Sequence, residues 1–273
     1  MIKLAVFGKP VVQSLSPRIH NLFAKQCGLD IDYQAIEATA ETFPDQVTEL
    51  SANGGRGCNI TVPLKRNAWQ LADRCSDSAS RAQAANTLVF HPSGEHHAHN
   101  TDGQGLVNDL NSRTDFPLSG ARICLIGAGG AAAGVLGTLL QSGPDCVVIT
   151  NRTAERATGL VKAHSDLGPI QTCPPDKISS VPAFDLIVNA TSLGHRGLAP
   201  ELSRSWLKPG GLCYDMNYGR AAEPLRRLCE KIGIPYSDGL GMLVGQAALS
   251  FQLWTEQSPD PGIVLEQLRQ SFR

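Results

Sequence analysis

Gly127, Gly129 and Ala132 follow a short apolar run near the middle of the chain. Residues 123–126 are apolar and predict a strand buried on both faces, and the small residues of 134–140 predict a closely packed helix after it. Between a strand and a helix, Gly127 permits a tight turn and Gly129 lets the backbone approach a pyrophosphate. The helix N-terminus offers free N–H groups to the phosphates, and Ala132 lets helix and strand pack closely. An ordinary glycine-rich loop is the alternative; the strand–turn–helix context favours a dinucleotide site.

The next predicted strand, 146–150, is followed by Arg152 and Arg156. An NAD-binding unit carries an acidic residue for the ribose 2′-hydroxyl here, about 20 residues after the turn. That acid is absent, and a guanidinium suits a 2′-phosphate by charge and forked geometry. The sequence therefore predicts NADP rather than NAD. Thr153 is a candidate helix N-cap, which would put Arg156 in the first helical turn. A cation there is unfavourable against the helix dipole, and a bound phosphate would offset this effect.

Two serines and a lysine in the first hundred residues are candidates for binding a polar ligand. Ser14 and Ser16 stand two apart in a segment that, if extended, aims both hydroxyls the same way. The alternative is that Ser16 caps a helix whose first residue is Pro17. Lys65 lies just past the predicted strand 57–62, where parallel α/β sheets place ligands. Its alternative is a solvated lysine that opens the next helix, and local pattern alone favours the structural alternative for both Ser16 and Lys65.

Three further polar groups have both a structural and a functional interpretation. Asn59 and Thr61 share one face of the predicted strand. Asp102 precedes an amphipathic segment, and a helix N-cap explains it without function. Residues 91–99 contain four histidines, but no other ligand stands at a recognisable metal-site spacing, so we predict an exposed polar hairpin and no metal.

Composition excludes several classes of protein. A hydrophobic content of 42% with 18% charged residues predicts a globular chain, and a net charge of −1 gives no footprint for nucleic acid or an anionic membrane. The eight cysteines are scattered, which argues against a zinc ribbon and suits a reducing cytosol. The apolar run at the N-terminus reaches Gly8 too soon to form the apolar core of a signal peptide. Residues 123–144 are uncharged, but their glycines favour strand plus helix over a membrane span.

Taken together, the motifs resemble those of the shikimate dehydrogenase family over nearly the whole chain. The stretches that carry this resemblance are Ser-Leu-Ser-Pro at 14–17, Asn-Ile-Thr-Val-Pro-Leu-Lys at 59–65, Ala-Asn-Thr at 85–87, Asn-Thr-Asp-Gly at 100–103, the glycine turn at 127–131, Asn-Arg-Thr at 151–153, Asn-Ala-Thr at 189–191, Asp-Met at 215–216 and Asp-Gly-Leu-Gly-Met-Leu at 238–243. Each is short, but the set in this order is specific.

The resemblance implies an α/β fold in three parts. A substrate-binding domain is expected at 1–103, a Rossmann-type NADP-binding domain at 104–240, and C-terminal helices at 241–273 that pack back on the first domain. It implies NADPH-dependent, reversible reduction of 3-dehydroshikimate to shikimate, a step of aromatic amino acid biosynthesis, in the cytoplasm. The partner is then a small molecule rather than nucleic acid or membrane, and a homodimer stays open.

The resemblance also implies roles for individual residues. Lys65 is the catalytic lysine, acting with Asp102, and Ser14 with Ser16 holds the substrate carboxylate. The other implied substrate contacts are Asn59, Thr61, Asn86, Tyr218 and Gln246. The implied cofactor contacts are Asp77, Gly127, Ala128, Gly129, Gly130, Ala131, Asn151, Arg152, Thr153, Arg156, Ala190, Thr191, Ser192, Met216, Gly239 and Met242.

Two other functions stay open at this point. One is a quinate/shikimate dehydrogenase of broader specificity, and the other a non-catalytic NADP-sensing protein on the same fold. Retention of Lys65 and Asp102 disfavours the sensor, because cofactor binding alone requires neither. His195 and Arg196 depart from the pairing expected on the nicotinamide side. The dehydrogenase interpretation requires the Lys65 amine to face the nicotinamide across one cleft.

Overall fold

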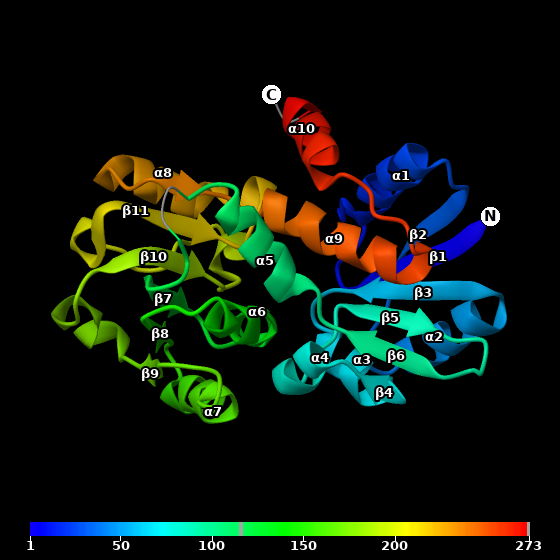
Figure 1. Cartoon of the computed structure of the whole chain (residues 1–273), viewed down its shortest axis with the longest axis horizontal. Coiled ribbons are helices and arrows are strands. Elements are labelled where there is room, and N and C mark those ends of the chain that lie inside the picture. Colours follow the sequence, from blue (N-terminus) through cyan, green and yellow to red (C-terminus); the bar gives the residue numbers. More distant parts are fainter. Residues whose placement is uncertain (115–116, 272–273) are drawn as a thin grey trace. The chain divides into compact units, whose positions relative to one another are not determined.

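The structure, a computed structural model, describes residues 1–114 and 117–271. The chain forms two compact units, Met1–Gly105 with Leu243–Arg273 and Leu106–Met242. In the described residues each unit contains one six-stranded sheet with helices around it (Figure 1). The predicted α/β class is thereby confirmed.

The sheet of the first unit mixes parallel and antiparallel strands. Its β1 pairs in parallel with β2 and β3, whereas β3, β5 and β6 pair antiparallel and β4 is parallel to β6. The strand order is β2 (Ile31–Glu37), β1 (Ile2–Gly8), β3 (Gly55–Ile60), β5 (Thr87–Phe90), β6 (His96–His99) and β4 (Arg74–Cys75). The helices are α1 (Ser16–Cys27), α2 (Phe43–Ala52), α3 (Lys65–Leu71), α4 (Asp77–Ala82), α10 (Pro261–Ser271) and parts of α5 (Asp102–Asn111) and α9 (Leu240–Thr255).

Two layers of helices bury this sheet. On one face, residues of α2, α3 and α4 pack with Phe7 and Leu88 of the strands. On the other, Trp254 of α9 packs with Leu4 and Val6, and its indole N–H donates to the Leu88 carbonyl at 2.9 Å. Gly57 is required there, because a Cβ at this position would lie 2.2 Å from the Trp254 Nε1. The C-terminal helices therefore pack on the first unit, as predicted.

The sheet of the second unit is entirely parallel. Its order is β12 (Tyr236–Ser237), β11 (Leu207–Asp215), β10 (Phe184–Asn189), β7 (Arg122–Ile126), β8 (Cys146–Thr150) and β9 (Ile170–Thr172). Numbered from β7, this is the 3-2-1-4-5-6 order of a Rossmann fold. The order reverses between β7 and β10, and ligands of such sheets bind beyond the carboxyl ends of the strands at that point.

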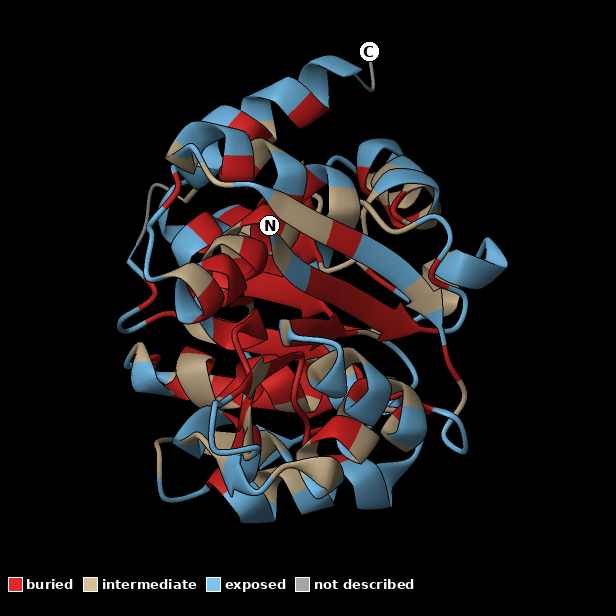
Figure 2. Cartoon of the chain, turned by 90° about the vertical axis from the view of Figure 1, so that its right-hand side faces the viewer, coloured by how far each residue is buried: buried red, intermediate tan, exposed pale blue. Residues whose placement is uncertain are grey.

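Both faces of the parallel sheet are covered. Residues of α5, α6 (Gly130–Gln141) and α7 (Ala154–His164) pack on one face, and residues of α8 (Glu223–Ile232) on the other. Residues of two 3-10 helices, Pro175–Ser180 and Arg204–Trp206, also pack on this second face. Two further 3-10 helices of this unit are Leu193–Arg196 and Gly219–Ala221. Figure 2 shows the buried residues gathered on the strands and on the inner sides of the helices. Within the described residues, no helix is long and apolar enough to cross a membrane.

The structure corrects the predicted helix cap at Ser16 and places the one at Thr153 as predicted. Helix α1 already includes Ser16, and Leu15 takes the N-cap position. Ser16 therefore does not cap the helix; its own N–H donates to the Ser14 hydroxyl at 3.2 Å, because the chain turns one residue earlier than the Ser-Pro pattern indicates. Thr153 does take the N-cap position of α7, but its side chain makes no capping hydrogen bond. Gly28 ends α1 in the left-handed conformation, as predicted.

Candidate active site

Lys65 and Asp102 form an ion pair in the first unit. Lys65 is the first residue of α3 and Asp102 the first of α5, so each side chain starts where a helix begins after a strand. The Lys65 Nζ lies 2.5 Å from the Asp102 Oδ2, and the two side chains are 19% and 7% exposed. A pair this buried gains little net stability, because desolvation offsets the attraction. Its chemistry, an ammonium held beside a carboxylate, suits transfer of a proton.

Asn86 joins this pair to α9. Its Nδ2 lies 2.9 Å from the second carboxylate oxygen of Asp102, 2.9 Å from the Gln246 Oε1 and 2.8 Å from the Thr101 Oγ1. Three acceptors compete for two hydrogens, so an incoming hydroxyl could replace one of them at little cost. One network thus joins the two predicted catalytic residues, Lys65 and Asp102, to two predicted substrate contacts, Asn86 and Gln246. Thr101 stands beside Asp102 in the chain, but its residue type and spacing predict no role for it.

Asn59 lies behind Asn86 and is buried, with 5% of its surface exposed. Its Nδ2 lies 3.1 Å from the Asn86 carbonyl and 3.0 Å from the Ser250 hydroxyl, and its Oδ1 accepts from the Tyr33 phenol at 2.7 Å. Both the NH₂ group and the carbonyl oxygen of the Asn59 amide thus already have hydrogen-bond partners within the protein. In this structure Asn59 braces the network, and its direct contact with a substrate stays a prediction.

The two serines meet, but not in an extended segment, because Leu15 between them takes a helical conformation. The Ser14 hydroxyl donates to the Ser16 hydroxyl at 3.1 Å; Ser16 is buried and Ser14 half-buried. Thr61 follows β3, with its N–H on the Phe7 carbonyl at 2.9 Å. Gly8 permits this approach, because a Cβ there would lie 2.3 Å from the Thr61 Cγ2. Tyr218 belongs to the second unit, where burial raises the pKa of its phenol.

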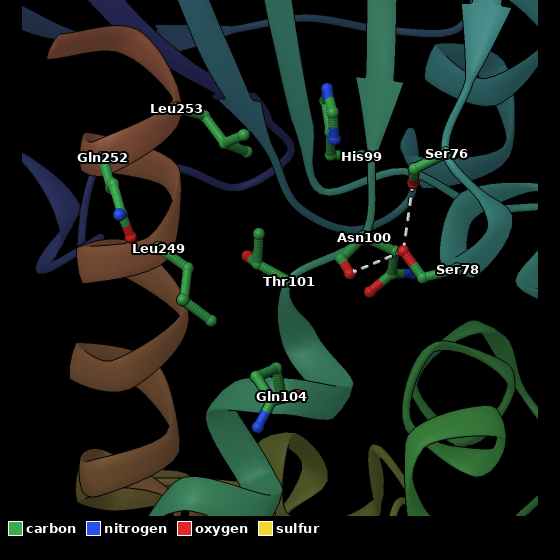
Figure 3. A pocket seen from close by; sticks show the side chains of 9 residues that line it. All are labelled: Ser76, Ser78, His99, Asn100, Thr101, Gln104, Leu249, Gln252 and Leu253. Carbon is green, nitrogen blue, oxygen red and sulfur yellow. Dashed lines mark hydrogen bonds between the residues drawn. The ribbon is translucent and has the colours of Figure 1, made fainter. Parts of the chain in front are cut away.

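A cavity of about 460 Å³ opens on the first unit, with Thr101 of the same network in its lining (Figure 3). Its walls come from α9 on one side and from the residues around the end of β6 and the start of α4 on the other. The lining residues are Ser76, Ser78, His99, Asn100, Thr101, Gln104, Leu249, Gln252 and Leu253. Asp77, the predicted acidic contact of the cofactor, is exposed next to this wall, at the first position of α4.

The glycine turn of the second unit contains glycines of two kinds. Gly127 has a φ of +112°, and a Cβ there would lie 3.2 Å from the Ala190 carbonyl, so the protein itself requires this glycine. At Gly129 and Gly130 a Cβ would meet no protein atom within 4 Å. The first turn of α6 holds no acidic residue, and no side chain caps it. Open space in front of uncapped N–H groups fits a pyrophosphate.

The neighbouring strand ends form a hydrogen-bonded cluster. The Asp215 Oδ1 accepts from Asn189 at 2.9 Å and from the Asn217 side chain at 2.7 Å, and Asn217 also donates to the Thr191 carbonyl at 3.0 Å. Burial raises the pKa of the Asp215 carboxyl to about 6, against the opposite effect of these amide donors. This cluster positions Ala190, Thr191, Ser192 and Met216, four predicted cofactor contacts.

Gly239 and Met242, two of the predicted cofactor contacts, are buried. A Cβ at Gly239 would lie 2.4 Å from the Met216 carbonyl oxygen, so packing accounts for this glycine. Met242 is 7% exposed and belongs to the core of the second unit. Ala128 and Ala131 lie within the glycine turn, and Ala128, at 9% exposure, belongs to the same core.

Arg152 and Arg156 are exposed beyond the end of β8. Asn151 shapes this loop, because its Nδ2 donates to the Thr153 carbonyl at 2.8 Å. In the described part of the chain, no carboxylate pairs with either guanidinium. Two unpaired cations near the turn are available to a phosphate. Over those same residues, no group of three or more His, Cys, Asp or Glu side chains could hold a metal ion.

Comparison with known proteins decides the family. Three family models match: the shikimate dehydrogenase substrate binding domain at residues 6–88, shikimate / quinate 5-dehydrogenase at 110–209, and the shikimate 5′-dehydrogenase C-terminal domain at 239–269. The shikimate dehydrogenase (NADP(+)) of Methylococcus capsulatus is 44% identical over 99% of this chain and 97% of its own length. This chain belongs to the shikimate dehydrogenase family.

Further proteins are similar to this chain in sequence and in fold. The shikimate dehydrogenase (NADP(+)) of Chromohalobacter salexigens is 45% identical over 99% of this chain and 98% of its own. The Ael1 enzyme from Pseudomonas putida superposes with a TM-score of 0.91 at 38% identity, covering 98% of each chain. The shikimate 5-dehydrogenase (AroE) from Thermus thermophilus, solved with NADP(H) and shikimate, has a TM-score of 0.83 at 32% identity over 99% of each chain. The resemblance inferred from the motifs is therefore confirmed.

Proposed function

We propose that this shikimate dehydrogenase family member reduces 3-dehydroshikimate to shikimate, reversibly and with NADPH. The observation that carries the proposal is the buried Lys65–Asp102 pair, linked through Asn86 to Gln246. An NADP-sensing protein needs no such pair. The relatives from Methylococcus capsulatus and Chromohalobacter salexigens are named shikimate dehydrogenase (NADP(+)), which supports the assignment of both the substrate and the cofactor.

The cofactor fits the second unit. The open space at Gly129 and Gly130 takes the pyrophosphate, and Arg152 with Arg156 takes the 2′-phosphate. When bound, NADPH supplies the hydride. We assign cofactor binding to residues 104–240 and substrate binding to residues 1–103. The further cofactor contacts predicted from the family, Asp77 included, and the substrate contact of Tyr218 belong to the same proposal.

Lys65 supplies the proton. As hydride reaches the carbonyl carbon of the substrate, negative charge grows on the carbonyl oxygen, and the Lys65 ammonium stabilises that charge and donates a proton to it. In the oxidation of shikimate, the neutral amine accepts the hydroxyl proton. The Asp102 carboxylate accepts a hydrogen bond from the Lys65 amine. Asp102 also fixes the direction of the amine, since its carboxylate is held by Asn86.

The substrate carboxylate is assigned to Ser14 and Ser16. Their hydroxyls already meet at 3.1 Å, and both can donate to an anion once that mutual bond is exchanged. The ring hydroxyls are assigned to Asn86, Asp102 and Gln246, with Thr61 and Asn59 beside them. These groups offer both donors and acceptors, as a polyhydroxylated ring requires.

An absorbance assay tests the proposal. The purified chain is mixed with NADP or NAD and with shikimate or quinate, and NADPH or NADH formation is followed. We expect turnover with shikimate and NADP. Quinate used at a similar kcat/KM would instead support the broader specificity, and tight NADPH binding without turnover would support the sensor. A homodimer and a cytoplasmic location stay predictions, which light scattering and cell fractionation test.

Replacing Arg152 with alanine should raise the KM for NADPH about 10- to 100-fold, because a hydrogen bond to a charged group contributes about 1.5–3 kcal/mol. The KM for NADH should change less than about twofold, because NADH lacks the 2′-phosphate. Steady-state kinetics with both cofactors give the two values. The matched control is Arg227→Ala, which removes an exposed guanidinium that pairs with Glu223 on α8. Equal effects on the two cofactors would exclude Arg152 from the 2′-phosphate site.

A further inference from the structure

His20 is a histidine of α1 without any exposed surface. Its imidazole stacks on the Tyr33 ring, with centroids 4.4 Å apart and planes 9° from parallel. The rings of Phe23, Phe251 and Trp254 surround it at 5.4–6.0 Å. Its Nε2 lies 3.0 Å from the Asn59 Oδ1, and its Nδ1 has no hydrogen-bond partner among the described residues. Packing alone would not require this nitrogen-bearing ring, because phenylalanine fills the same space.

The neighbours of Asn59 determine which His20 nitrogen carries the proton. The main-chain carbonyl of Asn86 can only accept, so the Asn59 NH₂ group must face it, at 3.1 Å. The Asn59 carbonyl oxygen then faces His20, whose Nε2 must be the donor. Burial lowers the pKa of His20 to about 3, so the imidazole is neutral and this one N–H is its only hydrogen-bond donor.

Asn59 connects His20 to the catalytic pair. The Asn59 NH₂ holds the main chain at Asn86, and the side chain of Asn86 holds the carboxylate of Asp102 at 2.9 Å. Asp102 in turn holds the Lys65 amine. Each link is a hydrogen bond between buried or nearly buried groups, where a lost partner cannot be replaced by bulk water.

We propose that His20 is a positioning residue for the proposed dehydrogenase reaction, acting through Asn59 and Asn86 on the substrate site. It touches neither substrate nor cofactor. Together with the Tyr33 phenol, its N–H donates to the Asn59 carbonyl oxygen and holds this amide in place, and the amide holds the strand end from which Asn86 reaches Asp102. The inference rests on the proposed function for its readout.

Two substitutions separate the donor from the ring. His20→Phe keeps an aromatic ring in the cluster and removes the N–H. His20→Gln keeps a donor that reaches the position of Nε2 and removes the ring. If His20 positions the site, kcat/KM for shikimate falls about fivefold in His20→Phe, because this is the net contribution of one hydrogen bond. In His20→Gln, kcat/KM is largely restored. The KM for NADP is unchanged in both.

Thermal unfolding should give the opposite order. His20→Phe keeps the ring contacts and should have the higher Tm, whereas His20→Gln should have the lower one. A merely structural role gives the same order in both measurements. The control is Phe23→Leu, a neighbour of the His20 ring without a polar atom, which should lower Tm and leave kcat/KM for shikimate unchanged.

The outcomes distinguish this inference from the proposed function. A wild-type chain that does not oxidise shikimate overturns the proposed function, and the inference with it. An active wild type whose variants rank alike in Tm and in kcat/KM overturns only the role of His20. Opposite rankings support it.

Discussion

Replacing Lys65 with alanine should lower kcat by about 10²- to 10⁴-fold, the range expected when a proton-transferring group is lost. The hydride donor and the remaining hydrogen bonds to the substrate stay in place, so the Kd for shikimate should change much less than kcat. Stopped-flow or steady-state absorbance gives kcat, and the shift of Tm with shikimate concentration gives binding.

This substitution also leaves Asp102 without its counter-charge at 7% exposure, so the variant must be shown to be folded by circular dichroism. Lys65→Met provides a second version that fills more of the vacated volume. Lys25→Ala, which removes an exposed lysine in the last turn of α1, is the control and should keep wild-type kcat. Turnover near the wild-type rate in both Lys65 variants would remove Lys65 from the reaction.

Replacing Asp102 with asparagine should lower kcat/KM for shikimate by about 10²-fold, because breaking a buried charge pair costs about 3–5 kcal/mol and part of this appears at the transition state. The new amide would still offer an oxygen to Asn86. Its NH₂ group would face the Lys65 ammonium, and two donors cannot bond each other. The double variant with Lys65→Ala should be no worse than Lys65→Ala alone, because the two residues act as a unit.

A buried pair of the second unit supplies the control for Asp102. Asp109 binds Arg113 at 2.7 Å and accepts from the Tyr214 phenol at 2.7 Å, and its side chain is 4% exposed. Asp109→Asn breaks a buried charge pair as Asp102→Asn does, so the two variants should lower Tm by similar amounts. In Asp109→Asn, however, kcat/KM for shikimate should stay within about threefold of wild type. Additive losses in the Lys65 and Asp102 double variant would contradict the coupled pair.

Local patterns were sufficient where a residue's role depends on its own segment. The apolar run before Gly127 predicted a buried strand, and β7 is that strand, with Gly127 at a φ of +112°. Gly28 ends α1 in the left-handed conformation because glycine adopts it without strain. The absence of an acid and the presence of Arg152 at the end of β8 could likewise be read from the order of residues. The family could be inferred from short motifs because their order is specific.

Local patterns failed where a side chain had a choice of partners. The Ser-Pro pattern favoured Ser16 as a cap, but Ser14 accepts the backbone N–H and Ser16 lies within the helix. Asp102 reads as a cap from its neighbours, yet Asn100 accepts its N–H at 3.1 Å, and its carboxylate binds Lys65, 37 positions earlier. Hydrogen bonds between distant segments form only when the sheet brings the strand ends together.

From the order of residues one can predict the class of fold, the glycine turn, the preference for NADP and the identity of the residues that could do chemistry, since these depend on residue type and on neighbours in the chain. The tertiary structure then sets how those residues work together. It placed His20 beside Asn59, 39 positions apart, and Asn86 beside Gln246, 160 positions apart. It also separated Gly129, which faces open space, from Gly239, which packs on Met216. The physical reason is that burial and partner geometry are properties of the packed chain, and no local period records them.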